Sequence, residues 1–471
     1  MKPQPTAALP AILAALLLAG CGNLVPPAEA PQPALRAQFR IPADGPATPA
    51  ATAAPNEWDD FFTDPRLRTV VGLALADNRG LRAGAEAVAR VRALYRVAEN
   101  AVLPELDAQA GATRQRSGGS SSQSFTLGVN VPAWEIDLFD RLGSLKGAAL
   151  ARYLAQQDNQ QAARLALVAE TAATWLQLAA DRQRLRLAEQ QRDSQQHTLS
   201  LTERRYQAGA ASGLDRARAQ AAFEAARGAA AEAAGTAERT RLALELLAGQ
   251  PLVEALLPDE QAQGPAAGAA TALPEPPAGL PATVLLQRPD LRATEQALQA
   301  AAFDVGAARA ARFPRITLTA SAGRRSSELD DLLRGGGSFW SLAPQLTLPL
   351  FDAGARQAEA EAAEAARRQA LASYEAALQA AFREVADALA VRDRLDERLH
   401  AQQAQVAAAE RGADLAEQSY RLGRASQLEL LDAQRQVSSA RQGLVTLRQA
   451  EQVNRVSLLK ALGGRWVQAA P

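Results

Sequence analysis

The sequence predicts a mainly α-helical protein with a small β part, built as two structural repeats. Three observations carry this prediction. A Tyr-x-x-Gly motif followed by an acidic residue occurs twice, each half contains a long stretch without glycine or proline, and alternating segments precede both stretches. The motif residues are Tyr206, Gly209 and Asp215, then Tyr420, Gly423 and Glu429. A duplicated elongated unit indicates an architecture rather than an active site.

The first segment, residues 1–20, has the shape of a signal peptide, because Lys2 precedes an apolar run too short to span a bilayer. It leads into Cys21 through Leu-Ala-Gly, which resembles the lipobox of bacterial lipoproteins. That resemblance implies a lipid-modified Cys21 as the mature N-terminus, and Gly22 is compatible with the outer membrane. The alternative is an ordinary export signal with a chance cysteine. Residues 21–57, rich in proline and alanine, are expected to form a lipidated tether.

Composition argues against several classes of function. Cys21 is the single cysteine, so no internal disulfide or thiolate metal cluster is expected. The 51 basic and 51 acidic residues leave no cationic excess for nucleic acid. His197 and His400 lie within helical stretches and are interpreted as solvated positions. We find no nucleophile with a base and no phosphate-binding loop, and therefore expect no enzyme and no cofactor apart from a covalent lipid on Cys21.

The first repeat is predicted over residues 58–249, as a helix, a β-hairpin and a long helical hairpin. Asp64 before Pro65 is a helix-start signal, and this helix is expected to continue to about Ala101. Between Leu106 and Ile136 the period changes to two, which predicts two strands joined by a polar connection at 117–124. The apolar members of the alternation are Phe125, Leu127, Val129 and Val131.

The second repeat is predicted over residues 284–464 with the same order of elements. An irregular linker at 250–283 precedes it, and a C-terminal tail at 465–471 follows it. Its two strands, one starting near Ile316 and one containing Trp340 and Leu346, are expected to flank a connection at 326–338. Four strands of roughly ten residues fit a tilted passage through a bilayer.

Each repeat closes with a predicted helical hairpin. The uninterrupted stretch 148–208 would extend on the order of 90 Å as a helix, and 355–411 is similar. Apolar residues within them fall at alternating steps of three and four, which is coiled-coil spacing. The turns are expected at 209–213 and 423–427. The coiled-coil positions are Leu165, Val168, Ala172, Trp175 and Ala179, then Leu378, Phe382, Val385 and Leu389.

Four membrane strands cannot stand alone, because unpaired backbone groups at an open sheet edge cost several kcal/mol each in lipid. Barrels formed by a single chain begin at about eight strands. Long thin hairpins likewise cannot bury both of their faces without neighbours. We therefore expect a closed oligomer of this chain, with a tunnel along its axis.

The order of these features resembles the TolC-type outer-membrane factor family, especially its OprM-like lipoprotein branch. The segments 134–141 and 286–291 look like the family's signatures at the start of the first long helix and of the second half. The resemblance implies a homotrimer with a twelve-stranded outer-membrane barrel and a periplasmic α-helical barrel. It also implies outer-membrane lipid, a periplasmic membrane-fusion adaptor and an inner-membrane pump of the resistance-nodulation-division type as partners.

The same resemblance assigns roles at the hairpin turns. Glu429 and Asp432 match acidic residues that line the periplasmic constriction, and Asp215, Tyr206 and Tyr420 match other residues of the gate. The resemblance places the tips, which would contact the adaptor, at Gly209, Gly213, Gly423 and Arg424. Where related proteins carry a gate arginine that pairs with the aspartate, this chain has Ala425. Arg424 either replaces that arginine or points outward.

The predicted function is a passive trimeric duct of a tripartite efflux system, exporting small molecules across the outer membrane. One alternative is the outer-membrane duct of a type I protein secretion system. Another is a non-conducting periplasmic coiled-coil lipoprotein that acts as a spacer. The alternating strands with Trp340 and Leu346 facing outward favour a duct over a spacer.

Overall fold

The computed structural model describes residues 24–27, 61–259, 282–335 and 337–464. The predicted signal peptide, Cys21, most of the inter-repeat linker and the C-terminal tail lie outside these ranges. The chain divides into two compact units. Among the described residues, the first unit comprises 24–27, 86–159 and 291–377, which include the four strands, and the second comprises 61–85, 160–259, 282–290 and 378–464.

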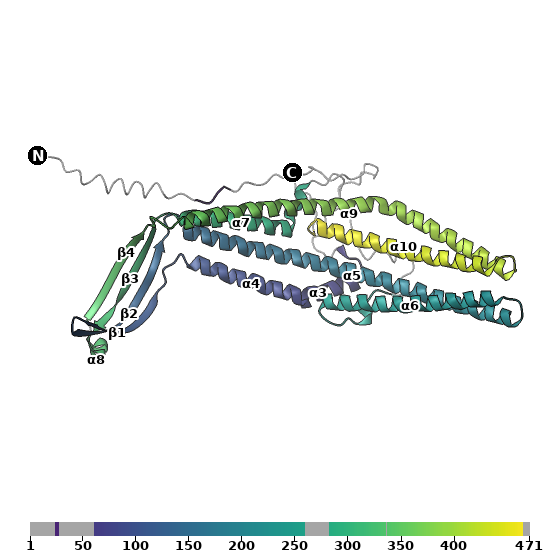
Figure 1. Ribbon diagram of the computed structural model, residues 1–471, viewed down its shortest axis with the longest axis horizontal. Helices are drawn as coiled ribbons and strands as arrows, with labels where there is room; N and C mark the ends of the chain where they lie inside the picture. The colour runs from purple at the N-terminus through teal and green to yellow at the C-terminus, as the bar shows by residue number, and fades with distance from the viewer. Residues whose placement is uncertain (1–23, 28–60, 260–281, 336, 465–471) are drawn as a thin grey trace. The chain divides into compact units, whose positions relative to one another are not determined.

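The first unit contains one antiparallel sheet of four strands in the order β1-β2-β3-β4, which lie side by side in Figure 1. The strands are β1 (Asp107–Ser117), β2 (Ser120–Ile136), β3 (Arg315–Ser326) and β4 (Gly337–Thr347). The central β2–β3 pair joins the two repeats, since β2 belongs to the first and β3 to the second. Strands β1 and β4 each pair with a single neighbour, so both sheet edges are open within the described chain.

Both strand connections differ from the sequence prediction. The first is not the polar segment 117–124, because Gly118 and Gly119 alone form the turn, both at positive φ. Such a two-residue turn matches the twist of a hairpin, and the following serines continue β2 in register with β1. In the second connection the sequence prediction missed a short helix, α8 (Leu329–Arg334), which buries Leu332.

The pairing register sorts the strand residues onto two faces. Val129 lies opposite Ala322, and Ala322 lies opposite Trp340, so these three share one face. This face is apolar and exposed in the isolated chain, with Trp340 79% exposed. The alternation slips at a β-bulge between Val131 and Trp134, which leads the strand towards its helix.

The helices of this unit are most of α4 (Arg79–Asn100), α7 (Pro289–Ala310) and the first parts of α5 (Arg141–Gln207) and α9 (Ala355–Arg421). Both α5 and α9 begin with an aspartate cap. Asp137 accepts hydrogen bonds from the Arg141 and Gly143 backbone N–H groups at 2.7 and 2.9 Å. Asp352 accepts one from the Gly354 N–H at 3.0 Å. These caps satisfy N–H groups that a helix start leaves without a partner.

The helix predicted from Asp64 to about Ala101 is two helices. Asp64 caps α3 (Pro65–Asp77) as predicted, by accepting from the Arg66 backbone N–H at 2.8 Å. Asn78 then adopts an extended conformation and ends α3. Its side-chain oxygen accepts from the Leu81 N–H at 3.0 Å, which starts α4. The single-helix prediction was wrong because an asparagine can serve as the cap of a second helix.

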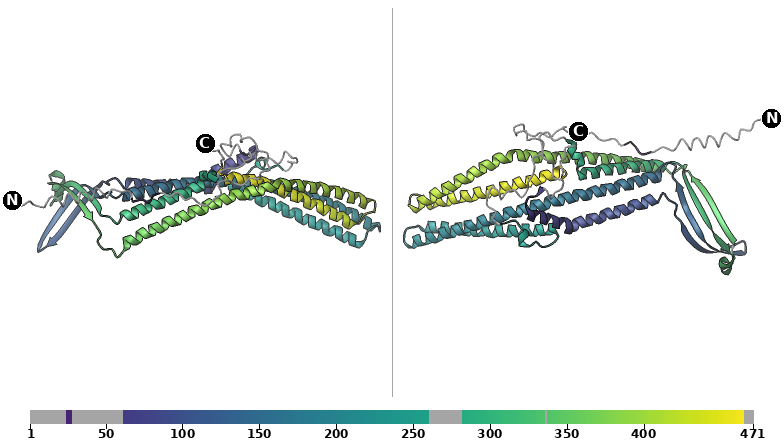
Figure 2. Two further views of the ribbon diagram at one scale, coloured as in Figure 1. Left: turned by 90° about the horizontal axis from the view of Figure 1, so that it is seen from above. Right: turned by 180° about the vertical axis from the view of Figure 1, so that it is seen from behind.

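The second unit is dominated by two helical hairpins that run alongside each other (Figure 2). One pairs α5 with α6 (Gly213–Ala248), and the other pairs α9 with α10 (Gln427–Ala461). Their seams are filled largely by small and β-branched side chains, among which Val168, Ala172 and Val385 are buried. The described residues of this unit also include the short 3₁₀ helices η1 (Glu254–Leu256) and η3 (Ala282–Gln287). Within the described ranges, no helix combines the length and the apolar character needed to cross a membrane.

One buried arginine joins the start of the second repeat to the end of the chain's last helix. Arg288 is 5% exposed, and its guanidinium donates to the Ala461 carbonyl at 2.8 Å. It also forms ion pairs with Asp290 at 2.7 Å and Glu384 at 2.8 Å. Replacing the arginine would therefore remove the hydrogen bond and both ion pairs at once.

We expect Arg288→Met to lower the stability of the second unit by about 2 kcal/mol, because it leaves the buried Ala461 carbonyl without its donor and removes the ion pairs with two half-exposed carboxylates. The matched control is Arg383→Met, which removes an exposed pair with Asp387 on α9 and should be nearly neutral. Chemical denaturation followed by circular dichroism would measure both. Equal stability of the two variants would show that the Arg288 contacts do not stabilise the unit.

Candidate functional site

The two hairpin turns share one backbone design. After α5, the Gly209 N–H donates to the Tyr206 carbonyl at 3.0 Å and the Ala210 N–H to the Arg205 carbonyl at 2.7 Å. After α9, the Gly423 N–H donates to the Tyr420 backbone carbonyl at 3.0 Å, and the Arg424 N–H donates to the Ser419 backbone carbonyl at 2.8 Å. This is a Schellman motif, and it requires the positive φ that both glycines adopt. The Tyr-x-x-Gly motif is thus a helix-ending signal in both repeats.

Each return helix begins with a capping box. The Ser212 hydroxyl accepts from the Asp215 N–H at 3.1 Å, while the Asp215 carboxylate accepts from the Ser212 N–H at 3.2 Å. Ser426 and Glu429 repeat the arrangement at 3.3 and 2.6 Å. Two of the acidic residues predicted for the gate therefore also start the helices that carry them.

The capping hydrogen bonds favour the ionised carboxylates. Bonds from the Ser212 side chain and backbone lower the pKa of Asp215, with Arg218 and Arg205 adding an electrostatic contribution. Bonds from the Ser426 backbone and side chain lower the pKa of Glu429. Since each pKa is lower in the folded protein, the stabilisation is present at neutral pH and is lost as the pH falls through the folded values. The Glu429 carboxylate is exposed and Asp215 is half-buried, and both groups remain charged at neutral pH.

The two tyrosines differ in their surroundings. Tyr420 is 8% exposed, and the Arg205 guanidinium from the other hairpin lies over its ring, 5.0 Å from the ring centre. Tyr206 is 42% exposed and lies under Arg216 of its own hairpin at 5.5 Å. A cation over an aromatic ring contributes about 0.5 to 2 kcal/mol, more when it is shielded from water. The Arg205–Tyr420 contact therefore joins the hairpins, whereas the Arg216–Tyr206 contact does not.

The interface between the hairpins near the turns is polar. Gln195 of α5 donates from Nε2 to Gln434 Oε1 of α10 at 2.8 Å, and Gln427 Nε2 donates to Thr202 Oγ1 at 3.5 Å. Farther from the turns, Arg184 Nη2 donates to Gln449 Oε1 at 2.9 Å. The Oε1 atoms of Gln195 and Gln427 are buried without a partner among the described residues. Because buried unpaired acceptors cost free energy, this interface holds the hairpins together less tightly than an apolar seam would.

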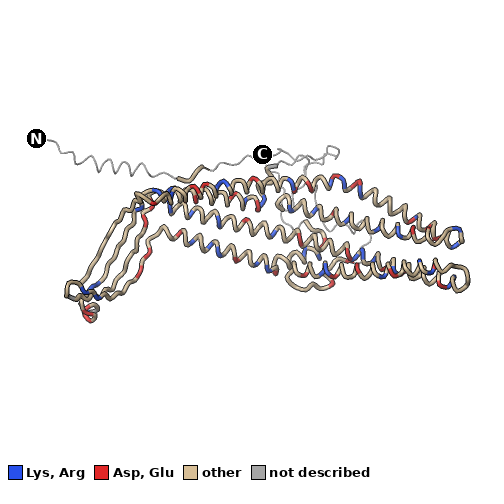
Figure 3. The backbone as a smooth tube through the Cα atoms, viewed as in Figure 1, with Lys and Arg blue, Asp and Glu red and all other residues tan. Residues whose placement is uncertain are grey.

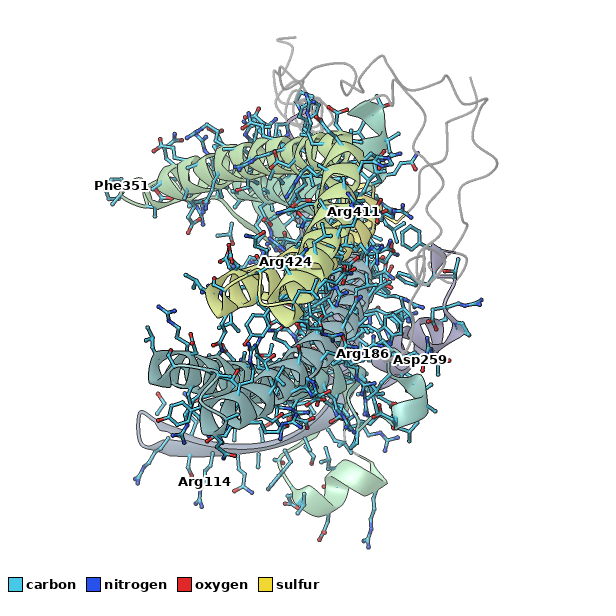
Figure 4. The ribbon with its side chains drawn as sticks, turned by 90° about the vertical axis from the view of Figure 1, so that its right-hand side faces the viewer. Arg114, Arg186, Asp259, Phe351, Arg411 and Arg424 are labelled. Atoms are coloured by element: carbon cyan, nitrogen blue, oxygen red, sulfur yellow. The ribbon has the colours of Figure 1, made fainter. Side chains whose placement is uncertain are left out.

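The remaining predicted residues lie on the exposed surface of the turns. The Asp432 carboxylate is held by its own helix, through Arg435 at 3.3 Å and Gln436 at 2.9 Å. Arg424, labelled at the α9–α10 turn in Figure 4, is exposed, and its guanidinium has no partner among the described residues. Among the described residues of one chain, Arg424 therefore forms no ion pair with Asp215. Gly213 opens α6, and Gly209 and Gly423 lie at the tips.

Sequence reasoning missed Arg205, Gln195 and Gln427, the residues that join the hairpins. Arg205 directly precedes Tyr206 of the repeated motif, which was the one indication in the sequence of a role for it. The ring that it contacts, however, is that of Tyr420 in the other repeat. Periodicity could not pair α5 with α10, because the pattern of one helix does not specify which neighbour covers it.

A second candidate is a cleft of 390 Å³ in the sheet unit, between the strand ends and the first turns of α5. Its buried carboxylate, Glu135, forms ion pairs with Arg141 at 2.7 Å and Arg315 at 2.6 Å. Phe139 and Phe313 stack beside it with ring centres 4.6 Å apart. These contacts fasten the sheet to its helices, which favours a structural role. The described residues contain no cluster of metal-binding side chains.

Comparison with known proteins identifies the family. The family model described as outer membrane efflux protein matches residues 70–250 and 280–464, one segment for each repeat. The chain belongs to this family, which is a family of outer-membrane channels rather than of enzymes. It is an outer-membrane efflux channel, located in the outer membrane and extending into the periplasm.

Individual relatives match along nearly the whole chain. The solvent efflux pump outer membrane protein SrpC of Pseudomonas putida is 39% identical over 468 residues, covering 97% of each chain. The cation efflux system protein CusC of Escherichia coli is 34% identical, covering 96% of this chain and 98% of CusC. The open-state structure of the Neisseria gonorrhoeae MtrE outer membrane channel has a TM-score of 0.79 at 34% identity, covering 93% of this chain and 97% of MtrE.

The capping boxes predict a measurable effect of charge. Replacing Glu429 by glutamine leaves a neutral and weaker acceptor for the Ser426 N–H, so that amide should exchange several-fold faster at neutral pH. As the pH falls through the lowered pKa of Glu429, its carboxylate protonates, and the wild-type amide should approach the variant after correction for intrinsic exchange. Hydrogen exchange by mass spectrometry gives both values. Glu417→Gln, an exposed carboxylate before the same turn, is the control, and an equal change in it would argue against the cap.

Proposed function

We propose that three copies of the chain close into a duct through the outer membrane. The observation that carries the proposal is the open sheet, whose edge strands β1 and β4 have no second neighbour among the described residues. A bilayer does not tolerate unpaired strand edges, so β1 of one copy must pair with β4 of the next. Three sheets of four strands would give a twelve-stranded barrel, within the range of known outer-membrane barrels.

The exposed faces of the sheet fit this assembly. One face presents Trp340, Leu342 and Leu346, which would contact lipid. The opposite face carries small and polar residues such as Thr317, Thr319 and Ser321, which would line water. An apolar exterior with a polar lumen is the pattern of a water-filled barrel. A lipid on Cys21 would add an anchor but would not replace the barrel.

In this proposal the hairpins of the three copies form the periplasmic part of the duct, and their turns meet the partner proteins. The partners are a periplasmic adaptor and an inner-membrane pump, most simply of the resistance-nodulation-division type. Membership in the efflux family supports this tripartite arrangement. The duct itself is passive, because the sequence provides no site for an energy-yielding reaction.

The proposed cargo is small molecules. SrpC is named for solvent efflux and CusC for cation efflux, so proteins of closely similar length carry different cargo. Neither name specifies what this chain exports. The type I secretion duct remains the alternative, and both relatives favour small-molecule efflux over it.

The gate is proposed to work by separation of the two hairpins. The α9–α10 turn carries Glu429 and Asp432, while the α5–α6 turn carries Asp215. Arg205 over Tyr420 and the glutamine contacts hold the hairpins together in one chain. Each contact is modest and polar, so an adaptor bound at the tips could replace it at small cost. That MtrE has been solved in an open state supports a channel with more than one state.

Removing the inter-hairpin contact should open the duct. We expect Arg205→Ala to raise the mean conductance and the fraction of time spent open in planar bilayers, because Tyr420 loses the cation over its ring. Arg216→Ala removes the corresponding contact inside one hairpin and should leave gating unchanged. If both variants conduct like the wild type, the hairpins are not held by this contact.

The conductance of the wild type tests the duct, and its ion selectivity tests the constriction. Three chains would present Glu429 and Asp432 in a ring that attracts cations. Glu429→Gln combined with Asp432→Asn keeps the side-chain shapes, and it should weaken cation preference in reversal-potential measurements. Unchanged selectivity would remove these residues from the constriction. No discrete conductance from the wild type at any voltage would favour the non-conducting spacer instead.

A further inference from the structure

Arginines occur on the apolar face of the sheet at one end of the strands. Arg114 and Arg116 of β1 lie opposite Gln123 and Ser121 of β2, two positions that continue the row of Phe125, Leu127 and Val129. Arg324 of β3 lies opposite Leu127 and so belongs to the same face. All three are exposed. Figure 4 shows the Arg114 side chain projecting outward from β1.

The distribution of charge along this face is one-sided. No aspartate or glutamate of the four described strands lies on it, since Asp107 and Glu135 fall on the opposite face by register. By register, basic residues are absent from its half nearest the helices, and Figure 3 shows blue positions at the far ends of the strands, beside the red positions of α8. Arg114, Arg116 and Arg324 form no ion pair with any described residue. We call these three residues the outer arginine band.

The position of the band suits a bilayer interface. An arginine facing lipid costs about 2 to 4 kcal/mol at the bilayer midplane and close to nothing near the interface. From Ile316 to Arg324 the strand covers about 27 Å, which a tilt of about 40° reduces to about 20 Å across the bilayer. The long side chain can extend several ångströms farther, so the guanidinium of Arg324 reaches the headgroup region. By register Arg324 lies level with Ala110 of β1, so Arg114 and Arg116 lie farther towards the same end of the sheet.

We propose that the outer arginine band binds the phosphate groups of anionic lipid in the outer leaflet. The helices that extend into the periplasm are attached to the opposite end of the strands, so the band faces the cell exterior. A guanidinium group can donate two parallel hydrogen bonds to one phosphate group, and arginines at the end of a largely apolar face complement a phosphorylated headgroup above its acyl chains. This inference rests on the proposed insertion of the strands in the bilayer. It goes beyond that proposal by specifying which class of lipid the barrel surface binds preferentially.

Arg325 provides a matched control. It is the next residue along β3 and lies at the same end of the strand, but the alternation places it on the opposite face. There its guanidinium lies over the Phe339 ring, 4.9 Å from the ring centre. Arg325→Gln therefore removes the same charge at the same depth without changing the lipid-facing surface.

The test compares lipid binding by the full-length protein in neutral detergent. Native mass spectrometry would follow titration with bisphosphorylated lipid A and with its dephosphorylated analogue. The wild type should prefer the phosphorylated lipid. One arginine near an anionic surface is worth about fivefold in affinity, so Arg114→Gln with Arg116→Gln and Arg324→Gln should weaken binding about a hundredfold. Arg325→Gln should remain within about twofold of the wild type.

Two results would overturn the inference. One is a triple variant that binds phosphorylated lipid A like the wild type, and the other is an equal loss in Arg325→Gln. If the triple variant does not fold, the single Arg114→Gln and Arg324→Gln variants, each expected to lose about fivefold, decide the matter. Conductance in phosphatidylcholine bilayers separates this inference from the proposed function. Intact channels without preference for phosphorylated lipid overturn the arginine band alone, whereas absence of channels overturns the duct.

Discussion

Hydrogen bonding of the strand backbones is the constraint on which the rest of the structure depends. A sheet of four strands leaves β1 and β4 each with one unsatisfied edge, and a lipid environment provides no donors or acceptors to replace the missing neighbour. The chain resolves this by duplication. Strands β2 and β3 come from different repeats and pair at the centre, so the two halves of the chain are joined before any further copy is added.

The repeats share a fold without sharing a role. Both turns end in a Schellman motif and restart with a serine-based capping box. Tyr420 is buried under a cation from the neighbouring hairpin, while Tyr206 is exposed under one from its own. The two helix ends therefore have the same backbone motifs. They differ in the burial of their tyrosines and in which hairpin supplies the arginine over each ring. The acidic residues that start the return helices keep their charge at neutral pH, as the proposed constriction requires.

Much of the fold could be predicted from the sequence, because it is encoded in local signals. The long helices follow from stretches without glycine or proline, and the cap at Asp64 from the proline that follows it. Local signals failed where a residue had two possible uses. Asn78 could continue a helix or cap a new one, and the serines after Gly119 could form a loop or a strand. Helix α8 was missed because its six residues lie in a connection too short to show periodicity.

The contacts between hairpins could not be predicted, because they depend on which helices become neighbours. Arg205 and Tyr420 are far apart in the sequence, and so are Gln195 and Gln434. The central claim remains that the open sheet is completed by other copies of the chain. Light scattering of the detergent-extracted protein, with the detergent contribution subtracted, tests this claim most directly. A closed barrel of this chain should have the mass of three chains, and a stable single chain with an intact sheet would contradict the proposed assembly.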